Sequence, residues 1–231
     1  MGAACDSLDL SQPLSQQIRV AIFAAFRAHH VLIARNQRLE NEHLHHFAQM
    51  FGEVEQHNIV KADGQRMEAV HVITNLDASG KPSARPFINS NYHWHSDKSY
   101  LKKPSLMTML YSVELPPEGG GDTQFADMTR AYAALPSETK AAIAGLRVVQ
   151  SLAHMRSSLG NPAPTPEEAQ SAPPVEQPLV RTHPETGEKS LYLGMYCSHV
   201  GGMEENKGRA RLRSLLDHAT QPQFLLTDRW A

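Results

Sequence analysis

Three side chains that could bind a metal ion stand two residues apart in the segment from Asn91 to Asp97, which reads Asn-Tyr-His-Trp-His-Ser-Asp. On an extended segment such side chains project to the same side, so His93, His95 and Asp97 could all face one cavity. Two imidazoles and a carboxylate suit a divalent metal of intermediate hardness and leave three positions free on iron(II). The spacing permits a metal site, although a His-x-Asp pattern also arises by chance in a chain with 13 histidines.

A second informative segment runs from Pro116 to Thr123 and reads Pro-Pro-Glu-Gly-Gly-Gly-Asp-Thr. Pro and Gly together interrupt helices and strands, so this segment is predicted to be a turn, followed by a strand over residues 123–126. No Lys-Ser or Lys-Thr pair follows the glycines, which excludes a phosphate-binding P-loop. Thr123 could be only a β-branched strand residue, which is the most common use of threonine in such a run.

The two segments resemble the iron(II)- and 2-oxoglutarate-dependent dioxygenase family that contains taurine dioxygenase and chlorophenoxyacetate dioxygenase, the TauD/TfdA family. The resemblance extends over nearly the whole chain, and Ser96 within Trp-His-Ser-Asp is closer to the chlorophenoxyacetate branch. The turn has three glycines where the family members carry two. Further matching segments, in the same order, are residues 2–14, 51–55, 127–136, 179–184, 198–200 and 218–224.

The resemblance implies roles for individual residues of this sequence. His95 and Asp97 would be iron ligands and therefore catalytic, and Thr123 would bind a carboxylate of the cosubstrate 2-oxoglutarate. Asn91 matches a position that contacts substrate in the taurine enzyme and would bind substrate here, and a loop-terminating asparagine is the alternative interpretation. His93 is predicted to line the substrate pocket, because the resemblance assigns it no contact with iron.

The resemblance also implies the reaction and the kind of substrate. With Fe(2+), 2-oxoglutarate and O2, the enzyme would hydroxylate a small carboxylate or sulfonate, for example an aryloxyacetate, and release succinate and CO2. His199 and Lys61 could line a pocket for this anionic substrate. A surface histidine and a solvated lysine are equally consistent with the sequence.

The family pattern continues past the last residue of this chain. It contains a Gly-Asp turn, a Trp-Asp-Asn strand, a distal histidine that is the third iron ligand, and an arginine that pairs with the far carboxylate of 2-oxoglutarate. We therefore expect one dioxygenase domain over residues 1–231 whose closing strands are absent, which leaves open strand edges.

Two alternatives to the dioxygenase stay open. Two protein ligands hold iron(II) weakly, so the chain could be a catalytically inactive, truncated remnant or a small-acid-binding module. It could also be a cupin-like metal enzyme that uses His93, His95 and Asp97 without 2-oxoglutarate. The last alternative predicts that loss of His93 abolishes metal binding, which the dioxygenase hypothesis does not.

Composition narrows the class of protein. A length of 231 residues with 41% hydrophobic and 20% charged residues fits one folded domain. The 22 basic and 24 acidic residues are spread along the sequence and give a net charge of −2. They form no basic stripe that would bind a phosphate backbone, so nucleic acid is not an expected partner. Cys5 and Cys197 form no Cys-x-x-Cys pattern, which suits a reducing compartment, and we expect a cytoplasmic protein. The apolar stretch 18–34 contains Arg and His, so neither a membrane span nor a signal peptide is predicted. A homo-oligomer stays possible.

The elements that must position these side chains follow from hydrophobic periodicity and breakers. Helices are predicted over residues 15–28, 41–51, 131–135, 137–146 and 204–220. Strands are predicted over residues 31–34, 70–74, 106–115, 123–126 and 223–226, and a hairpin over 179–182 and 191–193. This order predicts an α+β protein built around an antiparallel sheet or barrel. The resemblance implies a double-stranded β-helix, a jelly-roll or cupin-like core, with flanking helices and its C-terminal strands absent.

Overall fold

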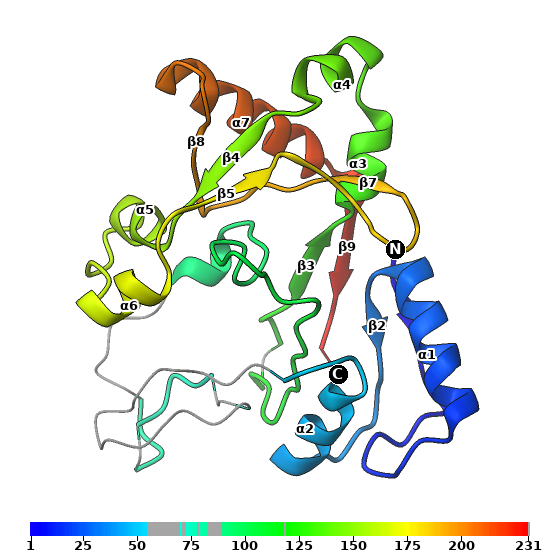
Figure 1. Ribbon diagram of the computed structural model, residues 1–231. Helices are drawn as coiled ribbons and strands as arrows, with labels where there is room; N and C mark the ends of the chain where they lie inside the picture. Colours follow the sequence, from blue (N-terminus) through cyan, green and yellow to red (C-terminus); the bar gives the residue numbers. More distant parts are fainter. Residues whose placement is uncertain (55–69, 71–72, 78, 83–88, 118, 231) are drawn as a thin grey trace. The chain divides into compact units, whose positions relative to one another are not determined.

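The computed structural model describes residues 1–54, 70, 73–77, 79–82, 89–117 and 119–230. They divide into two compact units, residues 1–87 and 88–230, and both contain helices and strands (Figure 1). The mixed α+β prediction is therefore confirmed. Lys61 and part of the strand expected over residues 70–74 lie outside the described residues. That residues 1–231 form one dioxygenase domain stays a prediction.

The described residues of the N-terminal unit form two helices and one short pair of parallel strands. Its elements are β1 (Ala3–Ala4), α1 (Gln16–His29), β2 (Leu32–Ile33) and α2 (Asn41–Gln49). Helix α1 begins after Ser15, whose hydroxyl accepts a hydrogen bond from the Ile18 N–H. Phe51 packs against rings of both helices, with centroid distances of 4.7 Å to Phe23 and 5.4 Å to Phe47. These aromatic contacts hold the two helices together.

The second unit carries the candidate site residues. Its elements are η1 (Asn89–Tyr92), β3 (Thr123–Ala126), α3 (Met128–Ala134), α4 (Ser137–Ile143), β4 (Arg147–Gln150), α5 (Leu152–Ser158), α6 (Pro166–Ser171), β5 (Val175–Pro178), β6 (Val180–Thr182), β7 (Lys189–Leu191), β8 (Cys197–Val200), α7 (Glu205–Ala219), η2 (Pro222–Phe224) and β9 (Leu225–Asp228). The strands pair in antiparallel fashion, in the orders β5-β4-β8, β3-β9 and β6-β7. Helix α7 packs against β8 (Figure 1).

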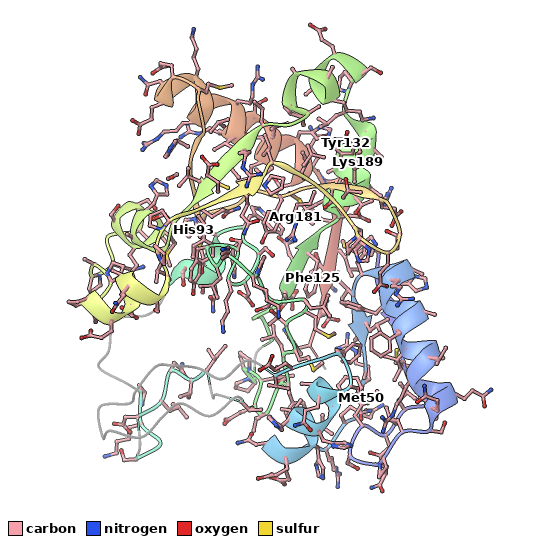
Figure 2. All side chains as sticks on the ribbon, viewed as in Figure 1. Met50, His93, Phe125, Tyr132, Arg181 and Lys189 are labelled. Atoms are coloured by element: carbon pink, nitrogen blue, oxygen red, sulfur yellow. The ribbon has the colours of Figure 1, made fainter. Side chains whose placement is uncertain are left out.

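One hydrophobic core joins the helices and strands of this unit. Helix α3, which carries Tyr132, packs on β7, which carries Lys189 (Figure 2). The core residues are Ala131, Leu135, Ile143, Val148, Leu179, Leu191, Leu193, Val200, Leu212, Leu215, Ala219 and Phe224. Burial of these side chains is the main stabilising contribution to the unit. Within the described part of the chain, every helix is too short or too polar to cross a bilayer.

Replacing Leu179 with alanine is expected to lower the free energy of unfolding by about 2 to 5 kcal/mol. The side chain is fully buried in this core, so its removal leaves a cavity. Leu106→Ala is the matched control, because Leu106 is 69% exposed, and a change within about 0.5 kcal/mol is expected there. Urea unfolding followed by circular dichroism measures both. Equal losses would contradict the position of Leu179 in the core.

Most of the predicted elements are confirmed with ends shifted by a few residues. The strand over Thr123–Ala126 forms as predicted, and the predicted hairpin forms with its second strand two residues earlier, at Lys189–Leu191. The strand predicted over residues 106–115 is wrong, because the backbone there is irregular. Leu106, Leu110 and Val113 of that segment expose 69%, 53% and 84% of their surface. Apolar strand composition becomes a strand only where another strand supplies hydrogen-bond partners, and no described strand pairs with this segment.

Candidate metal site

His95 and Asp97 converge on one point. The Nε2 atom of His95 lies 3.2 Å from Oδ1 of Asp97, with side chains that are 22% and 44% exposed. Ligand atoms about 2.1 Å from a metal ion, in adjacent octahedral positions, lie about 3 Å apart. The separation of the two atoms therefore fits one divalent ion bound between them. The extended segment expected from the i, i+2 spacing does not form, because the backbone there is irregular and turns at Asp97. The side chains of His95 and Asp97 nevertheless meet.

The imidazole of His95 is oriented by groups on both sides. Its Nδ1 atom lies 2.6 Å from the carbonyl oxygen of His93. A carbonyl only accepts hydrogen bonds, so Nδ1 carries the proton and Nε2 keeps its lone pair in the neutral ring. The ring of Tyr196 packs edge-on against His95, at a centroid distance of 6.4 Å, and also contacts Tyr100 at 4.7 Å. This arrangement leaves Nε2 as the candidate metal-binding nitrogen.

The two candidate ligands shift each other's protonation. The hydrogen bond with Asp97 raises the pKa of His95, against the opposing effect of burial. The hydrogen bond with His95 lowers the pKa of Asp97, and burial opposes this too, while a hydrogen bond from Thr108 adds to the lowering. Metal ion and proton compete for Nε2 of His95.

The segment that carries both ligands is attached to the loop between β7 and β8. The Met195 N–H donates a hydrogen bond of 2.9 Å to the carbonyl of Trp94. A Cβ atom on Gly194 would lie 2.8 Å from the Trp94 oxygen and 3.0 Å from Cα of His95. Only glycine permits this approach of the two backbones. The sequence analysis missed Gly194, since a glycine after a hairpin is commonly a turn residue.

A buried hydrogen bond fixes the other end of the segment. The hydroxyl of Ser99 donates to Oε1 of Gln150, at 3.0 Å, and both side chains are buried. Gln150 is the last residue of β4, so this contact ties the turn after Asp97 to the central strand of the three-stranded sheet. Buried polar groups that are satisfied in this way specify one backbone position.

The turn at the three glycines and the strand that begins at Thr123 form where the sequence predicts them. Thr123 is the first residue of β3, half-buried, and its hydroxyl oxygen accepts a hydrogen bond of 3.1 Å from the Trp230 indole N–H. Gly119, Gly120 and Gly121 have φ angles of 78°, 99° and 72°. This left-handed backbone explains why glycines occupy the turn.

The remaining predicted residues lie at the surface or in another cluster. Asn91, in η1, and His93, labelled in Figure 2, have exposed side chains. His199 lies in β8, with its Nδ1 atom 2.9 Å from the Ser198 hydroxyl oxygen. Its imidazole is close enough to His154 to contribute to the lowered pKa of that residue, for which burial is the main cause. The roles of Asn91, His93 and His199 in substrate binding stay predictions.

No three His, Cys, Asp or Glu side chains lie together as a metal site among the residues that the structure describes. The imidazole of His93 therefore does not complete a set with His95 and Asp97, and only its carbonyl contributes to the site. This geometry gives no support to the cupin-like alternative, which needs all three side chains. The two converging ligands fit two positions of a site whose third protein ligand stays a prediction.

A histidine and a carboxylate that converge in this way match two of the three ligands of the 2-His-1-carboxylate site of non-haem iron(II) oxygenases. The chain belongs to the family described as taurine catabolism dioxygenase TauD, TfdA family, whose model matches residues 1–231. The family predicted from the sequence is therefore confirmed, and its members are enzymes.

Relatives and solved structures agree with this assignment. The chain is 35% identical, over 99% of its length and 82% of the relative, to the alpha-ketoglutarate-dependent 2,4-dichlorophenoxyacetate dioxygenase of Cupriavidus pinatubonensis (strain JMP 134). It is 36% identical to the enzyme of the same name from Burkholderia sp. (strain RASC), over 87% of the chain and 70% of that relative. A crystal structure of AAD-2 with Mn(II) and N-oxalylglycine matches with a TM-score of 0.88 and 36% identity, covering 100% of this chain and 81% of that one.

Proposed function

We propose that the chain is an iron(II)- and 2-oxoglutarate-dependent dioxygenase that hydroxylates a small carboxylate, with an aryloxyacetate as the preferred class. The convergence of His95 Nε2 and Asp97 Oδ1 carries the proposal. The relatives that act on 2,4-dichlorophenoxyacetate support the substrate class, in preference to a sulfonate. The same relationship supports a double-stranded β-helix core, because the described sheets of the second unit are antiparallel and the chain matches the AAD-2 structure over its full length.

The residues of the chain bind and orient the reactants. His95 would bind iron(II) through the Nε2 lone pair and Asp97 through a lone pair of Oδ1, and the hydroxyl of Thr123 would donate a hydrogen bond to a carboxylate of 2-oxoglutarate. Bound iron(II) supplies the dioxygen chemistry that protein side chains lack. Tyr196, which is buried, and Tyr100 give the His95 side of the site an aromatic wall that limits water. The chain thus fixes geometry and surroundings while the cofactor performs the oxidation.

The proposed reaction is balanced in atoms and electrons. One oxygen atom of O2 enters succinate as 2-oxoglutarate is oxidised and loses CO2. The other enters a C–H bond of the substrate, which becomes C–OH. An aryloxyacetate hydroxylated at the carbon beside its ether oxygen is a hemiacetal, and this breaks down to a phenol and glyoxylate. Phenol release is therefore a direct measure of hydroxylation.

The test is turnover of 2,4-dichlorophenoxyacetate by the purified chain with Fe(II), 2-oxoglutarate and air. We expect 2,4-dichlorophenol and succinate in equal amounts, and neither product when 2-oxoglutarate is omitted. Taurine in place of the aryloxyacetate tests the sulfonate alternative, with succinate and sulfite as products. An absence of succinate with every substrate would contradict the dioxygenase proposal.

A small-acid-binding module is the second candidate, favoured by the presence of only two converging ligands among the described residues. An anaerobic titration of Fe(II) in the presence of 2-oxoglutarate separates the candidates. The dioxygenase predicts the weak visible charge-transfer band of an iron chelate, whereas the binding module predicts none. Metal binding that does not respond to 2-oxoglutarate would favour the cupin-like alternative.

A further inference from the structure

Thr108 contacts the carboxylate oxygen of Asp97 that is not beside His95. The Thr108 Oγ1 atom lies 2.8 Å from Oδ2 of Asp97, whereas Oδ1 lies 3.2 Å from Nε2 of His95. An ionised carboxylate only accepts hydrogen bonds, so the threonine hydroxyl is the donor. The two oxygens of Asp97 therefore have different partners, and only Oδ1 is directed at the place of the metal.

We propose that Thr108 is a positioning residue that keeps Asp97 a monodentate metal ligand through Oδ1. The proposal rests on the proposed function. A carboxylate that rotates to bind through both oxygens occupies two of the six positions of an octahedral ion. The hydroxyl of Thr108 opposes this rotation because Oδ2 would lose its hydrogen bond. One more position then stays free for 2-oxoglutarate or O2.

Both candidate ligands are thus held by a second group. The carbonyl of His93 fixes the ring of His95, and the hydroxyl of Thr108 fixes the carboxylate of Asp97. Such outer partners change metal affinity by about 10- to 100-fold when they are removed. The backbone carbonyl of His93 survives any side-chain substitution. Thr108 is therefore the partner that mutagenesis can remove.

The experiment compares Mn(II) affinity of the wild-type chain with that of Thr108→Val and Thr108→Ser. Free Mn(II) is followed by its electron paramagnetic resonance signal. Valine keeps the shape of threonine without the hydroxyl, and we expect an affinity about 10- to 100-fold lower. The Thr108→Ser variant keeps the hydroxyl donor, so its Mn(II) affinity is expected to be within about 3-fold of wild type. This change is well below the loss expected when an outer partner is removed. Thr182→Val is the matched control, since Thr182 is exposed in β6, and its affinity should be unchanged.

The outcomes separate the positioning role from stability and from the proposed function. Equal affinity of Thr108→Val and wild type would overturn the inference, as would a serine variant as weak as the valine variant. A lower melting temperature of metal-free Thr108→Val without lower Mn(II) affinity would also overturn it, because the role would then be structural. A wild-type chain that binds no Mn(II) would refute the proposed function and the role of Thr108 together.

A different contact supports a second inference, at Thr123. The pairing of β3 with β9 brings Trp230 close to it, and the indole N–H donates to its Oγ1 atom at 3.1 Å. An indole nitrogen only donates, so it occupies a lone pair of Oγ1 and leaves the O–H free to donate elsewhere. We infer that Trp230 is a positioning residue that directs the Thr123 hydroxyl, as a donor, to a carboxylate of 2-oxoglutarate. This inference also rests on the proposed function.

Calorimetric titration of 2-oxoglutarate into the Mn(II)-loaded chain tests the role of Trp230. Thr123→Val removes a hydrogen bond to a charged group and should weaken binding by about 10- to 100-fold. Trp230→Phe keeps an aromatic ring but removes the N–H donor together with the five-membered ring, and should weaken binding by about 2- to 10-fold. The Mn(II) affinity of both variants should be unchanged. This measurement is the control for folding, because a general loss of structure would also lower Mn(II) affinity. Weak binding by Thr123→Val with normal binding by Trp230→Phe would overturn the inference alone. Normal binding by Thr123→Val would instead refute the assignment of Thr123 and, with it, the inference.

Discussion

Replacing His95 with alanine is expected to reduce the affinity for Fe(II) or Mn(II) by at least about 100-fold, because loss of a direct ligand exceeds the loss of an outer partner. Asp97→Ala should have an effect of the same size, since Oδ1 of Asp97 is the second candidate ligand, 3.2 Å from Nε2 of His95. Turnover should fall below detection in both variants. Isothermal titration with Mn(II) and the 2,4-dichlorophenol assay measure the two effects.

His93→Ala is the control that separates the dioxygenase from the cupin-like alternative. His93 has an exposed side chain and contributes its backbone carbonyl to His95, which alanine preserves. Metal affinity should therefore stay within about 3-fold of wild type, below the loss expected for an outer partner. A loss as large as that of His95→Ala would mean that the imidazole of His93 is itself a ligand. Normal metal binding by both His95→Ala and Asp97→Ala would place the metal site elsewhere.

The local part of the site could be predicted from the sequence. His95 and Asp97 are two residues apart, so their convergence depends on the backbone of a single short segment. The glycine turn was predictable for the same reason, because three successive glycines permit the left-handed backbone that residues 119–121 adopt. Patterns of this kind need no knowledge of the fold.

Contacts between distant segments were not predictable. Trp230 reaches Thr123 across 107 residues, and Gly194 meets the backbone of Trp94 only because the β7–β8 loop returns to the metal segment. A tryptophan or a glycine in a single sequence does not indicate which distant residue it will contact. Thr108 escaped notice for a related reason, since it lies in a segment predicted to be a strand, where threonine is common.

In the fold, too, local features could be predicted from the sequence and long-range strand pairing could not. Strand β4 (Arg147–Gln150) was not predicted, and residues 144–146 before it were assigned to the preceding helix, which the structure ends at Ile143. A glycine with φ of 80° at position 145 separates that helix from the strand. Val148 and Gln150 of β4 are buried, and β5 and β8 supply its partners on both sides. Four residues are too few for alternation to decide between helix and strand, so tertiary pairing decides.

Replacing Gly194 with alanine is expected to impair the metal site through a residue that binds no metal. The new Cβ atom would lie 2.8 Å from the Trp94 oxygen and 3.0 Å from Cα of His95, so one backbone must move. Gly194 does not have the left-handed φ that favours glycine, and the cost is therefore steric. Overpacking of this kind lowers the free energy of unfolding by about 1 to 3 kcal/mol. A displacement of about 1 Å in the ligand segment can lower turnover by about 100-fold.

Gly201→Ala is the matched control for this effect. A Cβ atom there would meet the flexible carboxylate of Glu176 at 3.4 Å, and its nearest backbone contact, the Arg147 carbonyl oxygen, would be 3.7 Å away. Stability should change by less than about 0.5 kcal/mol, and Mn(II) affinity should be that of the wild type. Thermal unfolding, Mn(II) titration and phenol release measure the three quantities for both variants. Wild-type metal affinity and turnover in Gly194→Ala would mean that the Trp94–Met195 contact does not hold the His95–Asp97 segment, because the two backbones could then separate without moving the ligands.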